Sequence, residues 1–376
     1  MRVLFWCDAF RPNIGGVEEL AWQFLNAMSE RGHRFTVITH RDHDSLPATT
    51  TGRDISIHRL PFRRALTDRN PAQLLRLRKQ AMDLARAARP DLLHLYFAGY
   101  SAAFLLPIAD ALAAPMLVTL HIDMDSPAGD STLAAAIDHA DWVAGCSRSV
   151  LEPFRGRFPS LAGKTSVIHN GVSEPVPPSA GPDTGRPFLL CARRLVRDKG
   201  VDLAVSMMAH VRRRFPDIRL VIAGSGPERS HLERQVAASG LGDAIEFLGP
   251  VAADEMPRLI AQATIVLLPS RSEGLPLIAL EAAWLARPIV GTAVGGIPEF
   301  VVHGHTGLVV PPEDPVALAD AVCELLGHRQ RLAEMGHAAI ERVRTHFSWE
   351  EHVSRYDDLY RRMSGDRFMP GDRAGR

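Results

Sequence analysis

The sequence predicts an α/β protein built from two doubly wound domains, each with a parallel sheet covered by helices on both faces. Short apolar runs typical of buried strands alternate along the chain with longer segments typical of helices. The alternation stops once, at residues 173–187, which are rich in proline, glycine and serine, and then restarts. A length of 376 residues also favours two domains, each able to bury a core.

The first half contains apolar runs that suit strands and two segments with helical character. Residues 96–120 are apolar, but Pro107, Asp110 and Pro115 interrupt them, which favours a buried helix and a strand over a membrane span. The elements expected here are strands at 3–7, 34–39, 55–59, 92–96, 116–120, 142–146 and 166–168, and helices at 17–31 and 73–88.

The second half repeats the pattern. We expect strands at 188–192, 219–223, 245–248, 265–269 and 288–291, and helices at 201–215, 231–239, 256–262 and 277–285. The expected domains are 1–172 and 188–346, joined by a linker at 173–187 and followed by a helix and tail at 347–376. Ligands of doubly wound sheets bind beyond the carboxyl ends of the strands. The loops of interest are therefore 8–16, 121–130, 193–200, 224–227 and 270–276.

Composition excludes several classes of function. The formal net charge is zero, so nothing global indicates nucleic-acid binding. The apolar run at the N-terminus is too short for a signal peptide, so we expect a cytoplasmic protein. No histidine or cysteine spacing suits a metal site. The scattered cysteines are expected to be small buried side chains in a reducing compartment: Cys7, Cys146, Cys191 and Cys323.

Two glutamates with seven residues between them are the most informative motif. Glu273 falls in a loop, and Glu281 falls inside the helix that follows. A helix N-terminus favours phosphate, so this segment could hold an anion with a hydroxyl-accepting carboxylate on either side. That arrangement suits a sugar nucleotide.

A glycine pair follows the first expected strand. Gly15 and Gly16 have no side chains, so a phosphate could approach the N–H groups at the start of the next helix. A tight turn explains the pair equally well. The sequence has no Gly-x-Gly-x-x-Gly fingerprint, which counts against a dinucleotide site.

Polar residues at two other strand ends could contribute to a site. Arg194 and Lys199 follow a strand, and two fixed cations there could hold a diphosphate. A solvated basic loop is the alternative, and the neighbouring Arg193 and Arg197 leave open which cation matters. His121 ends an apolar strand, where it could bond a sugar hydroxyl or serve as a structural histidine.

A local excess of positive charge lies at residues 59–79. Within it, one acid, Asp68, stands against seven cations: Arg59, Arg63, Arg64, Arg69, Arg76, Arg78 and Lys79. This segment could be a solvated helix face, or it could dock on an anionic membrane surface or an anionic acceptor.

Together these motifs resemble the retaining glycosyltransferases of family 4, also called group 1, which have the GT-B fold. The resemblance covers nearly the whole chain and rests on the order and spacing of seven segments: 12–18, 169–172, 194–200, 224–227, 272–281, 295–299 and 307–311. It implies two Rossmann-like domains that face a central cleft, with the sugar nucleotide on the second domain and the acceptor on the first. The last helix, about 349–363, would cross back to the first domain.

The resemblance also implies roles for individual residues. Arg194 and Lys199 would neutralise the diphosphate leaving group, Glu273 would contact the transferred sugar, and His121 would lie near the reacting centre. Other residues would contact the donor: Gly15, Gly16, Asn170, Gly224, Phe247, Leu275, Leu277, Ile278 and Glu281. Many members have a second glycine where this chain has Pro276. Proline supplies no N–H, so one possible donor contact is missing.

The implied reaction is transfer of a glycosyl group from a nucleoside-diphosphate sugar to a hydroxyl, with retention and without a cofactor or an essential metal. The family tendency favours uracil as the base, with guanine second. Lipid-linked saccharides, polysaccharides and small glycosides all stay open as acceptors. With a lipid-linked acceptor, the protein would be peripheral at the inner face of the membrane. A sugar-nucleotide epimerase, a nicotinamide-dependent dehydrogenase and a non-catalytic binding module are the alternatives.

Overall fold

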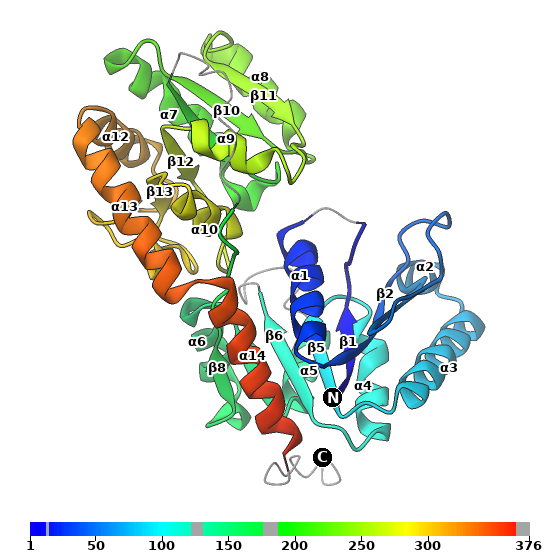
Figure 1. Cartoon of the computed structure of the whole chain (residues 1–376). Coiled ribbons are helices and arrows are strands. Elements are labelled where there is room, and N and C mark those ends of the chain that lie inside the picture. The colour runs from blue at the N-terminus through cyan, green and yellow to red at the C-terminus, as the bar shows by residue number, and fades with distance from the viewer. Residues whose placement is uncertain (13–14, 122–130, 176–186, 366–376) are drawn as a thin grey trace. The chain divides into compact units, whose positions relative to one another are not determined.

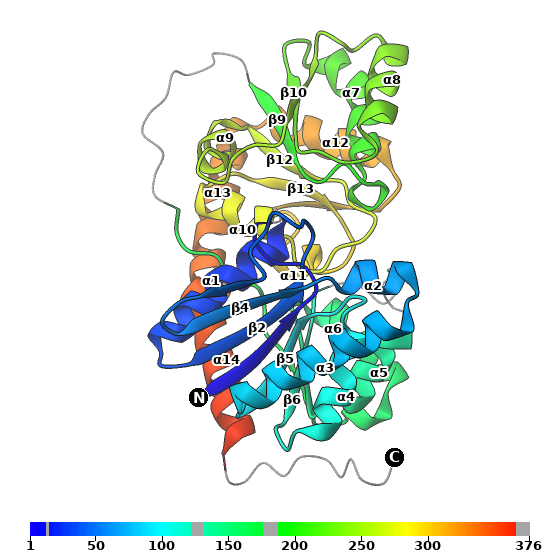
Figure 2. The same cartoon turned by 90° about the vertical axis from the view of Figure 1, so that its right-hand side faces the viewer.

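The structure is a computed structural model that describes residues 1–12, 15–121, 131–175 and 187–365. The chain divides into two compact units. Unit 1 comprises Met1–His169 together with the segment from His352 onward, and unit 2 comprises Asn170–Glu351. Figures 1 and 2 show each unit as a sheet between two layers of helices. The predicted α/β architecture of two doubly wound sheets is therefore confirmed.

Unit 1 is built on a sheet of eight strands in the order β3-β4-β2-β1-β5-β6-β7-β8. The apolar runs of the sequence form its strands, and each neighbouring pair is parallel except β3 with β4. The strands are β1 (Arg2–Cys7), β2 (Arg34–His40), β3 (Thr49–Thr51), β4 (Ile55–Leu60), β5 (Leu92–Phe97), β6 (Met116–Leu120), β7 (Trp142–Gly145) and β8 (Thr165–Val167).

The antiparallel β3 departs from the predicted all-parallel sheets. Thr49–Thr51 is an exposed edge strand that follows β2 and pairs with β4 through a tight connection, a geometry that parallel strands cannot use. The helices of unit 1 are α1 (Gly16–Glu30), α2 (Phe62–Asp68), α3 (Pro71–Ala88), α4 (Ala102–Ala111), α5 (Ser131–His139), α6 (Arg148–Arg157), the 3₁₀ helix η1 (Pro159–Leu161) and α14 (Trp349–Ser364).

Helix α14 is held on the sheet of unit 1 by buried polar contacts. The Tyr360 hydroxyl lies 2.6 Å from Nδ1 of His94 on β5, and the Tyr356 hydroxyl lies 3.1 Å from Oγ1 of Thr119 on β6. Phe24 of α1 packs edge-on against both tyrosines. Helices α1 and α14 thus cover one face of this sheet, and Figure 2 shows α3, α4 and α5 on the other.

Unit 2 has a six-stranded parallel sheet in the order β11-β10-β9-β12-β13-β14. Its strands are β9 (Phe188–Ala192), β10 (Arg219–Ala223), β11 (Ile245–Gly249), β12 (Ile265–Leu268), β13 (Ile289–Thr292) and β14 (Gly307–Val310). Its helices are α7 (Val201–Arg214), α8 (Arg229–Ser239), α9 (Met256–Gln262), α10 (Leu277–Trp284), α11 (Ile297–Phe300), α12 (Pro315–Leu326), α13 (Arg329–His346) and the 3₁₀ helix η2 (Arg197–Lys199).

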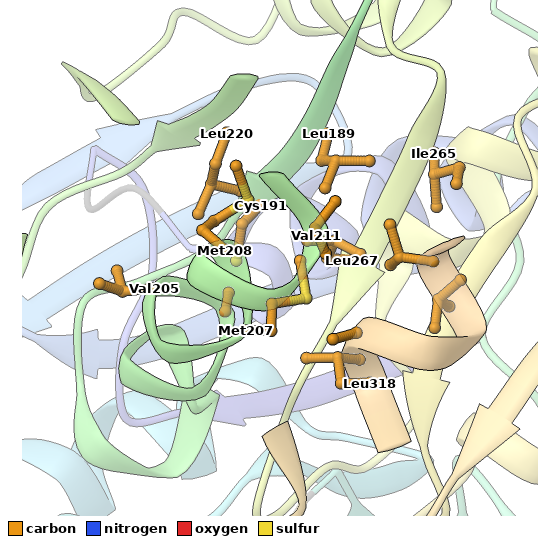
Figure 3. Packing of buried hydrophobic residues seen from close by; sticks show 14 of the residues in the cluster. Leu189, Cys191, Val205, Met207, Met208, Val211, Leu220, Ile265, Leu267 and Leu318 are labelled. Atoms are coloured by element: carbon orange, nitrogen blue, oxygen red, sulfur yellow. The ribbon is translucent and has the colours of Figure 1, made fainter. Parts of the chain in front are cut away.

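The core of unit 2 forms where α7 and α12 pack on the sheet. Alternate residues of β9, including Leu189 and Cys191, meet Met208 and Val211 of α7 (Figure 3). Side chains alternate across a strand, so the residues between them serve the opposite face. All four cysteines are buried and unpaired with one another, as the sequence predicts.

Both sheets have a point where the strand order reverses. In unit 1 it lies between β1 and β5, and in unit 2 between β9 and β12. At such a point the loops after two neighbouring strands turn to opposite faces and leave room for a ligand. The loops that follow β9 and β12, which begin near Arg193 and Ser270, are therefore brought together by topology.

Candidate functional site

The reversal point of unit 2 gathers a buried group of charges around one carboxylate. Glu273, which is 6% exposed, lies in the loop after β12, and its Oε1 accepts hydrogen bonds from Lys199 at 2.9 Å and from the Ser270 hydroxyl at 2.8 Å. Nη2 of Arg193 donates to the same oxygen. The exposed Arg194 lies near enough to influence Lys199. The structure thus brings the predicted Glu273 and Lys199 into contact, with the predicted Arg194 near Lys199.

These charges shift the pKa values of the group. Burial on its own would raise the pKa of Glu273, but Arg193 and Lys199 outweigh burial, so the pKa is lowered and the carboxyl is ionised at neutral pH. The pKa of Lys199 is lowered, chiefly by burial and also by Arg193 and Arg194, although Glu273 opposes the change. The result is a fixed anion surrounded by cations, and the pKa of one of these cations, Lys199, lies below its ordinary value.

Close backbone contacts hold these loops in place. Gly295, with a φ of +53°, packs so closely that a Cβ there would lie 1.9 Å from the carbonyl oxygen of Glu273. A Cβ on Gly224, at a φ of +137°, would lie 1.9 Å from the carbonyl oxygen of Arg193. The glycines that the sequence marks at these strand ends thus allow direct backbone packing around the charged group.

The loops on either side of the reversal point are also tied by Arg271. Its guanidinium makes two 2.7 Å bonds to the carboxylate of Asp202, and it also pairs with Glu313. Its backbone N–H donates to the Asp198 carbonyl at 2.8 Å. Arg271 therefore fixes the segment of η2 that carries Lys199 against the segment that carries Glu273.

The paired-glutamate motif continues into α10. The N–H groups of the first turn of this helix point out of its N-terminal end. The N–H groups of the first turn of an α-helix have no partner within the helix. Here Pro276 is the N-cap, and no described side chain caps these groups. Asn170 donates from Nδ2 to the Leu275 carbonyl at 2.9 Å, which fixes the preceding loop. Glu281 lies within α10 and is half-buried. An anion beyond Leu277 and Ile278 would be favoured electrostatically.

The predicted residues at β10 and β11 lie next to each other. The Gly224 N–H donates to the Gly249 carbonyl at 2.7 Å, which places the end of β11 beside the loop after β10. The Phe247 ring is half-buried, with the guanidinium carbon of Arg229 5.8 Å from its centroid. A flat apolar ring with an adjacent cation is a surface on which a base could stack.

The remaining predicted residues belong to unit 1. His121 follows β6 and is 7% exposed, and its ring centroid lies 4.7 Å from that of Tyr96. Neither ring nitrogen of His121 has a hydrogen-bond partner among the described residues. Burial, aided by His352, lowers the pKa of His121 to about 3, so the ring is neutral at pH 7. It can offer a hydrogen bond but no positive charge.

The glycine pair at the start of α1 packs against an acidic side chain. Gly15 is the extended N-cap of α1, and a Cβ there would lie 2.1 Å from Oε2 of Glu18. Gly16 begins the helix and is exposed. The absence of a side chain at Gly15, which was expected to let a phosphate approach, therefore also makes room for the Glu18 carboxylate.

The expected basic segment at 59–79 is split by the structure. Arg59 does not belong to the surface, since it is 8% exposed and donates to the Thr50 hydroxyl at 2.9 Å. It lies on β4, where the alternation of side chains directs it inward. The other six cations are exposed on or beside α2 and α3 and form what we call the basic face: Arg63, Arg64, Arg69, Arg76, Arg78 and Lys79.

Sequence reasoning missed Arg193, Ser270 and Arg271 as members of the site. Arg193 stands directly before the predicted Arg194, and sequence alone could not tell which of the two faces Glu273. Ser270 and Arg271 begin the loop that holds Glu273, and their place after an apolar strand was the signal that could have found them. In the described part of the chain, no group of three or more histidine, cysteine or acidic side chains is arranged to hold a metal ion.

Comparison with solved structures defines the fold class as GT-B. Sucrose-phosphate synthase from Thermosynechococcus elongatus superposes with a TM-score of 0.81 at 23% identity, over 96% of this chain and 98% of that one. HepE from Anabaena, solved in complex with UDP, superposes with a TM-score of 0.77 at 20% identity, over 96% and 99% of the two chains. At these identities the likeness concerns the fold.

Sequence comparison identifies the family. Residues 173–342 match the model for glycosyl transferases group 1, and residues 14–175 match that for glycosyltransferase family 4. Glycogen synthase of Mycobacterium tuberculosis is 31% identical over 303 residues, which are 73% of this chain and 69% of that protein. The chain belongs to this glycosyltransferase family, as its motifs predict.

A second relative matches over a shorter stretch. The GDP-mannose-dependent alpha-(1-6)-phosphatidylinositol monomannoside mannosyltransferase of Mycobacterium tuberculosis is 37% identical over 183 residues, or 47% of this chain. The match spans about half the length of that relative, 48%. Among the described residues, no helix has the length and apolar character needed to cross a membrane.

Proposed function

We propose that this chain is a retaining glycosyltransferase that moves a sugar from a nucleoside-diphosphate sugar to a hydroxyl acceptor. The observation that carries the proposal is the group around Glu273 in unit 2. There Lys199 contacts a carboxylate at the reversal point of a parallel sheet, where such folds bind their ligands, and Arg194 lies near Lys199. Family membership supports the same reading.

In the proposed reaction, the bond between the anomeric carbon and the diphosphate breaks while a bond to the acceptor oxygen forms on the same face. The acceptor proton passes to the leaving phosphate. Arg194, Lys199 and the N-terminus of α10 stabilise the charge that develops on the diphosphate, so no metal is needed for this step. Glu273 is already occupied by three donors on one oxygen, which suits an anchored contact to the sugar better than a nucleophile.

The donor is proposed by comparison with relatives, and the acceptor is proposed to belong to one of three classes. HepE was solved with UDP, and the mycobacterial relative is described as GDP-mannose-dependent, so we propose a UDP-sugar first and a GDP-sugar second. Unit 1 is proposed to select the acceptor, a lipid-linked saccharide, a polysaccharide or a small glycoside. His121 is proposed to donate or accept a hydrogen bond at a sugar hydroxyl, since it is neutral.

The experiment that tests the activity measures release of nucleoside diphosphate from a panel of UDP- and GDP-sugars, with an acceptor extract and with EDTA present. A working transferase releases one diphosphate only when acceptor is added. Conversion to another sugar nucleotide without acceptor would support an epimerase, whereas release of the diphosphate without acceptor would show hydrolysis of the donor. Binding without turnover would support a non-catalytic module. A variant Arg194→Ala with full turnover would refute the role given to Arg194.

The basic face supports a proposed contact with an anionic membrane. Leu75 is 66% exposed among its cations, and exposed apolar side chains within a basic surface suit the interface of an anionic bilayer. Several of these cations make only long ion pairs, such as the 3.9 Å contact of Arg63 with Asp42. The protein would then act in the cytoplasm and at the inner face of the membrane.

Charge reversal tests the membrane contact. We expect Arg63→Glu, Arg64→Glu and Arg76→Glu together to reduce binding to phosphatidylserine vesicles by about a hundredfold or more, at about 1 kcal/mol for each residue. A matched control reverses three exposed arginines of unit 2, Arg213, Arg214 and Arg234. Equal binding by wild type and the first triple variant would exclude the proposed contact, and so would an equal loss in the control.

A further inference from the structure

The Arg193 guanidinium is buried beside Glu273, and its backbone is fixed. Its side chain is 5% exposed and Nη2 donates to Glu273. Its N–H donates to the Ala223 carbonyl at 2.8 Å, and its own carbonyl lies against Gly224 with no room for a Cβ between them. The backbone of Arg193 is therefore fixed at the end of β9, and its buried side chain has little room to move.

Lys199 contacts the same carboxylate oxygen but is held differently. Its side chain is 16% exposed, and Nζ also lies 3.3 Å from the Ser272 carbonyl. A lysine carries its charge on a flexible stem of four carbons, whereas the guanidinium of arginine is planar and keeps its geometry. Of the two cations on Glu273, Lys199 is the one able to exchange this partner for a ligand.

We propose that Arg193 is a positioning residue, which holds Glu273 ionised and in place when the donor diphosphate draws Lys199 away. The inference rests on the proposed function, because it assumes that a nucleoside diphosphate binds beside Lys199. It differs from the role given to Arg194, which is exposed and is proposed to touch the diphosphate itself.

The charges of the group explain why this second cation matters. A buried carboxylate that loses its cation is strongly unfavourable, so Lys199 could leave only if another positive charge stayed. Arg193 provides that charge. Arg193 also repels Lys199, and this repulsion weakens the hold of Glu273 on the lysine. Without Arg193, Lys199 would be retained by Glu273, and a diphosphate would have to compete with a stronger internal ion pair.

The Arg193 guanidinium also has a donor to spare. Nη1 is buried and makes no hydrogen bond within the described part of the chain. An unsatisfied buried donor costs about 1–3 kcal/mol. The Arg193 side of the group therefore keeps a donor that a further acceptor could satisfy.

A double-mutant cycle tests this inference through the binding of UDP and GDP, measured by calorimetry. We expect Arg193→Met to weaken binding of the preferred nucleotide by about tenfold or more, the equivalent of at least about 1.4 kcal/mol. When Glu273→Gln removes the carboxylate charge, the further change Arg193→Met should leave the affinity within about twofold, because Lys199 is no longer retained. The conservative variant Arg193→Lys should restore most of the affinity.

Each other outcome has a distinct meaning. If Arg193→Met binds as tightly as wild type, the inference is wrong while the proposed function stands. If Arg193→Met weakens binding equally with and without Glu273→Gln, Arg193 contacts the ligand directly and the inference is also wrong. If Arg193→Met does not fold, then Arg193→Lys alone decides, since a tenfold loss there would overturn a role based on charge. If wild type binds neither nucleotide, the proposed function and this inference both fall.

Discussion

Two buried polar groups, one in each unit, are held in opposite ways. In unit 1, His94 lies beneath α14, within 2.6 Å of the Tyr360 hydroxyl and 2.8 Å of the Thr119 hydroxyl, and burial keeps its pKa well below the ordinary value. In unit 2, Glu273 is surrounded by Arg193 and Lys199 and stays charged. The neutral network joins a helix to a sheet, whereas the charged one holds a cation that a ligand can attract.

The difference shows where to look for function. The neutral groups around His94 satisfy one another, so that network needs no ligand. Two cations on one buried carboxylate leave a local excess of positive charge, and the exposed Arg194 adds to it. That excess suits the charge of a diphosphate, which is why we place the donor in unit 2. Four changes test the contrast, in decreasing order of expected effect.

The largest effect is expected from removing the charge of Glu273. The change Glu273→Gln leaves the buried Arg193 without its anion, so we expect the free energy of unfolding to fall by about 3–5 kcal/mol. The double change Arg193→Met with Glu273→Gln removes both charges and should recover part of that loss. Urea unfolding followed by fluorescence measures both. A loss below about 1 kcal/mol for Glu273→Gln would show that the ion pair is not buried as described.

A methyl group at Gly295 should disturb the same carboxylate sterically. Gly295→Ala places Cβ 1.9 Å from the Glu273 carbonyl oxygen, so the loop must move, at a cost of about 1–3 kcal/mol and with a loss of turnover. Gly304→Ala is the matched control, since Gly304 also has a positive φ but no atom of the described residues lies within 4 Å of an added Cβ. The control should show only the backbone cost, about 1 kcal/mol, and normal turnover. Equal effects of the two changes on turnover would contradict the packing role.

Unit 1 should respond to acid through its neutral histidines. Burial lowers the pKa of His352 to about 4 in the folded state, against about 6.5 in an unfolded chain. Between these values the unfolded chain binds a proton that the folded chain does not, so stability falls as the pH falls from 6.5 to 4. The contribution is about 1.4 kcal/mol for each pH unit.

The variant His352→Asn isolates this contribution. Asparagine can still donate to the His169 carbonyl, which Nδ1 of His352 approaches at 2.7 Å, but it does not titrate. We expect the melting temperature of the variant to depend less steeply on pH between 6.5 and 4 than that of wild type. Parallel curves for the two proteins would show that His352 already titrates normally.

The smallest effect is expected at Arg271, whose partners are partly exposed. Arg271→Lys loses the two-pronged contact with Asp202, which is 33% exposed, and should cost about 0.5–1 kcal/mol. Because Arg271 joins the loops of Lys199 and Glu273, the same change should raise the KM for the donor severalfold. Arg331→Lys, at an exposed ion pair with Glu324, is the control and should leave KM unchanged. An unchanged KM in both variants would show that Arg271 does not position the site.

The sequence predicted most of the architecture because buried strands need apolar runs. Strands such as β6 and β9 and the helix α9 lie where expected. It missed β3, whose three exposed threonines form a strand only through pairing with β4. It also treated Arg59 as part of a surface segment, because the inward direction of a side chain on an edge-side strand depends on register with its neighbours.

The site was predicted in outline for similar reasons. The positions of Glu273 and Lys199 in the sequence made them candidates, since each residue follows a predicted strand. The two strands are neighbours, so the residues lie at the same edge of the sheet. Arg193 could not be separated from Arg194 because the two are neighbours with the same chemistry. The structure separates them, since the Arg193 side chain is buried against Glu273 and Arg194 is exposed.

The most direct test of the donor site compares nucleotide binding by wild type and Lys199→Met in calorimetry with UDP, GDP, ADP and NAD, without added metal. We predict that wild type binds one nucleoside diphosphate selectively and that Lys199→Met weakens this binding by about tenfold or more. Thermal unfolding of both proteins without ligand serves as the control for folding. Binding of NAD alone, or equal affinity of the two proteins for the diphosphate, would contradict a donor site at Lys199.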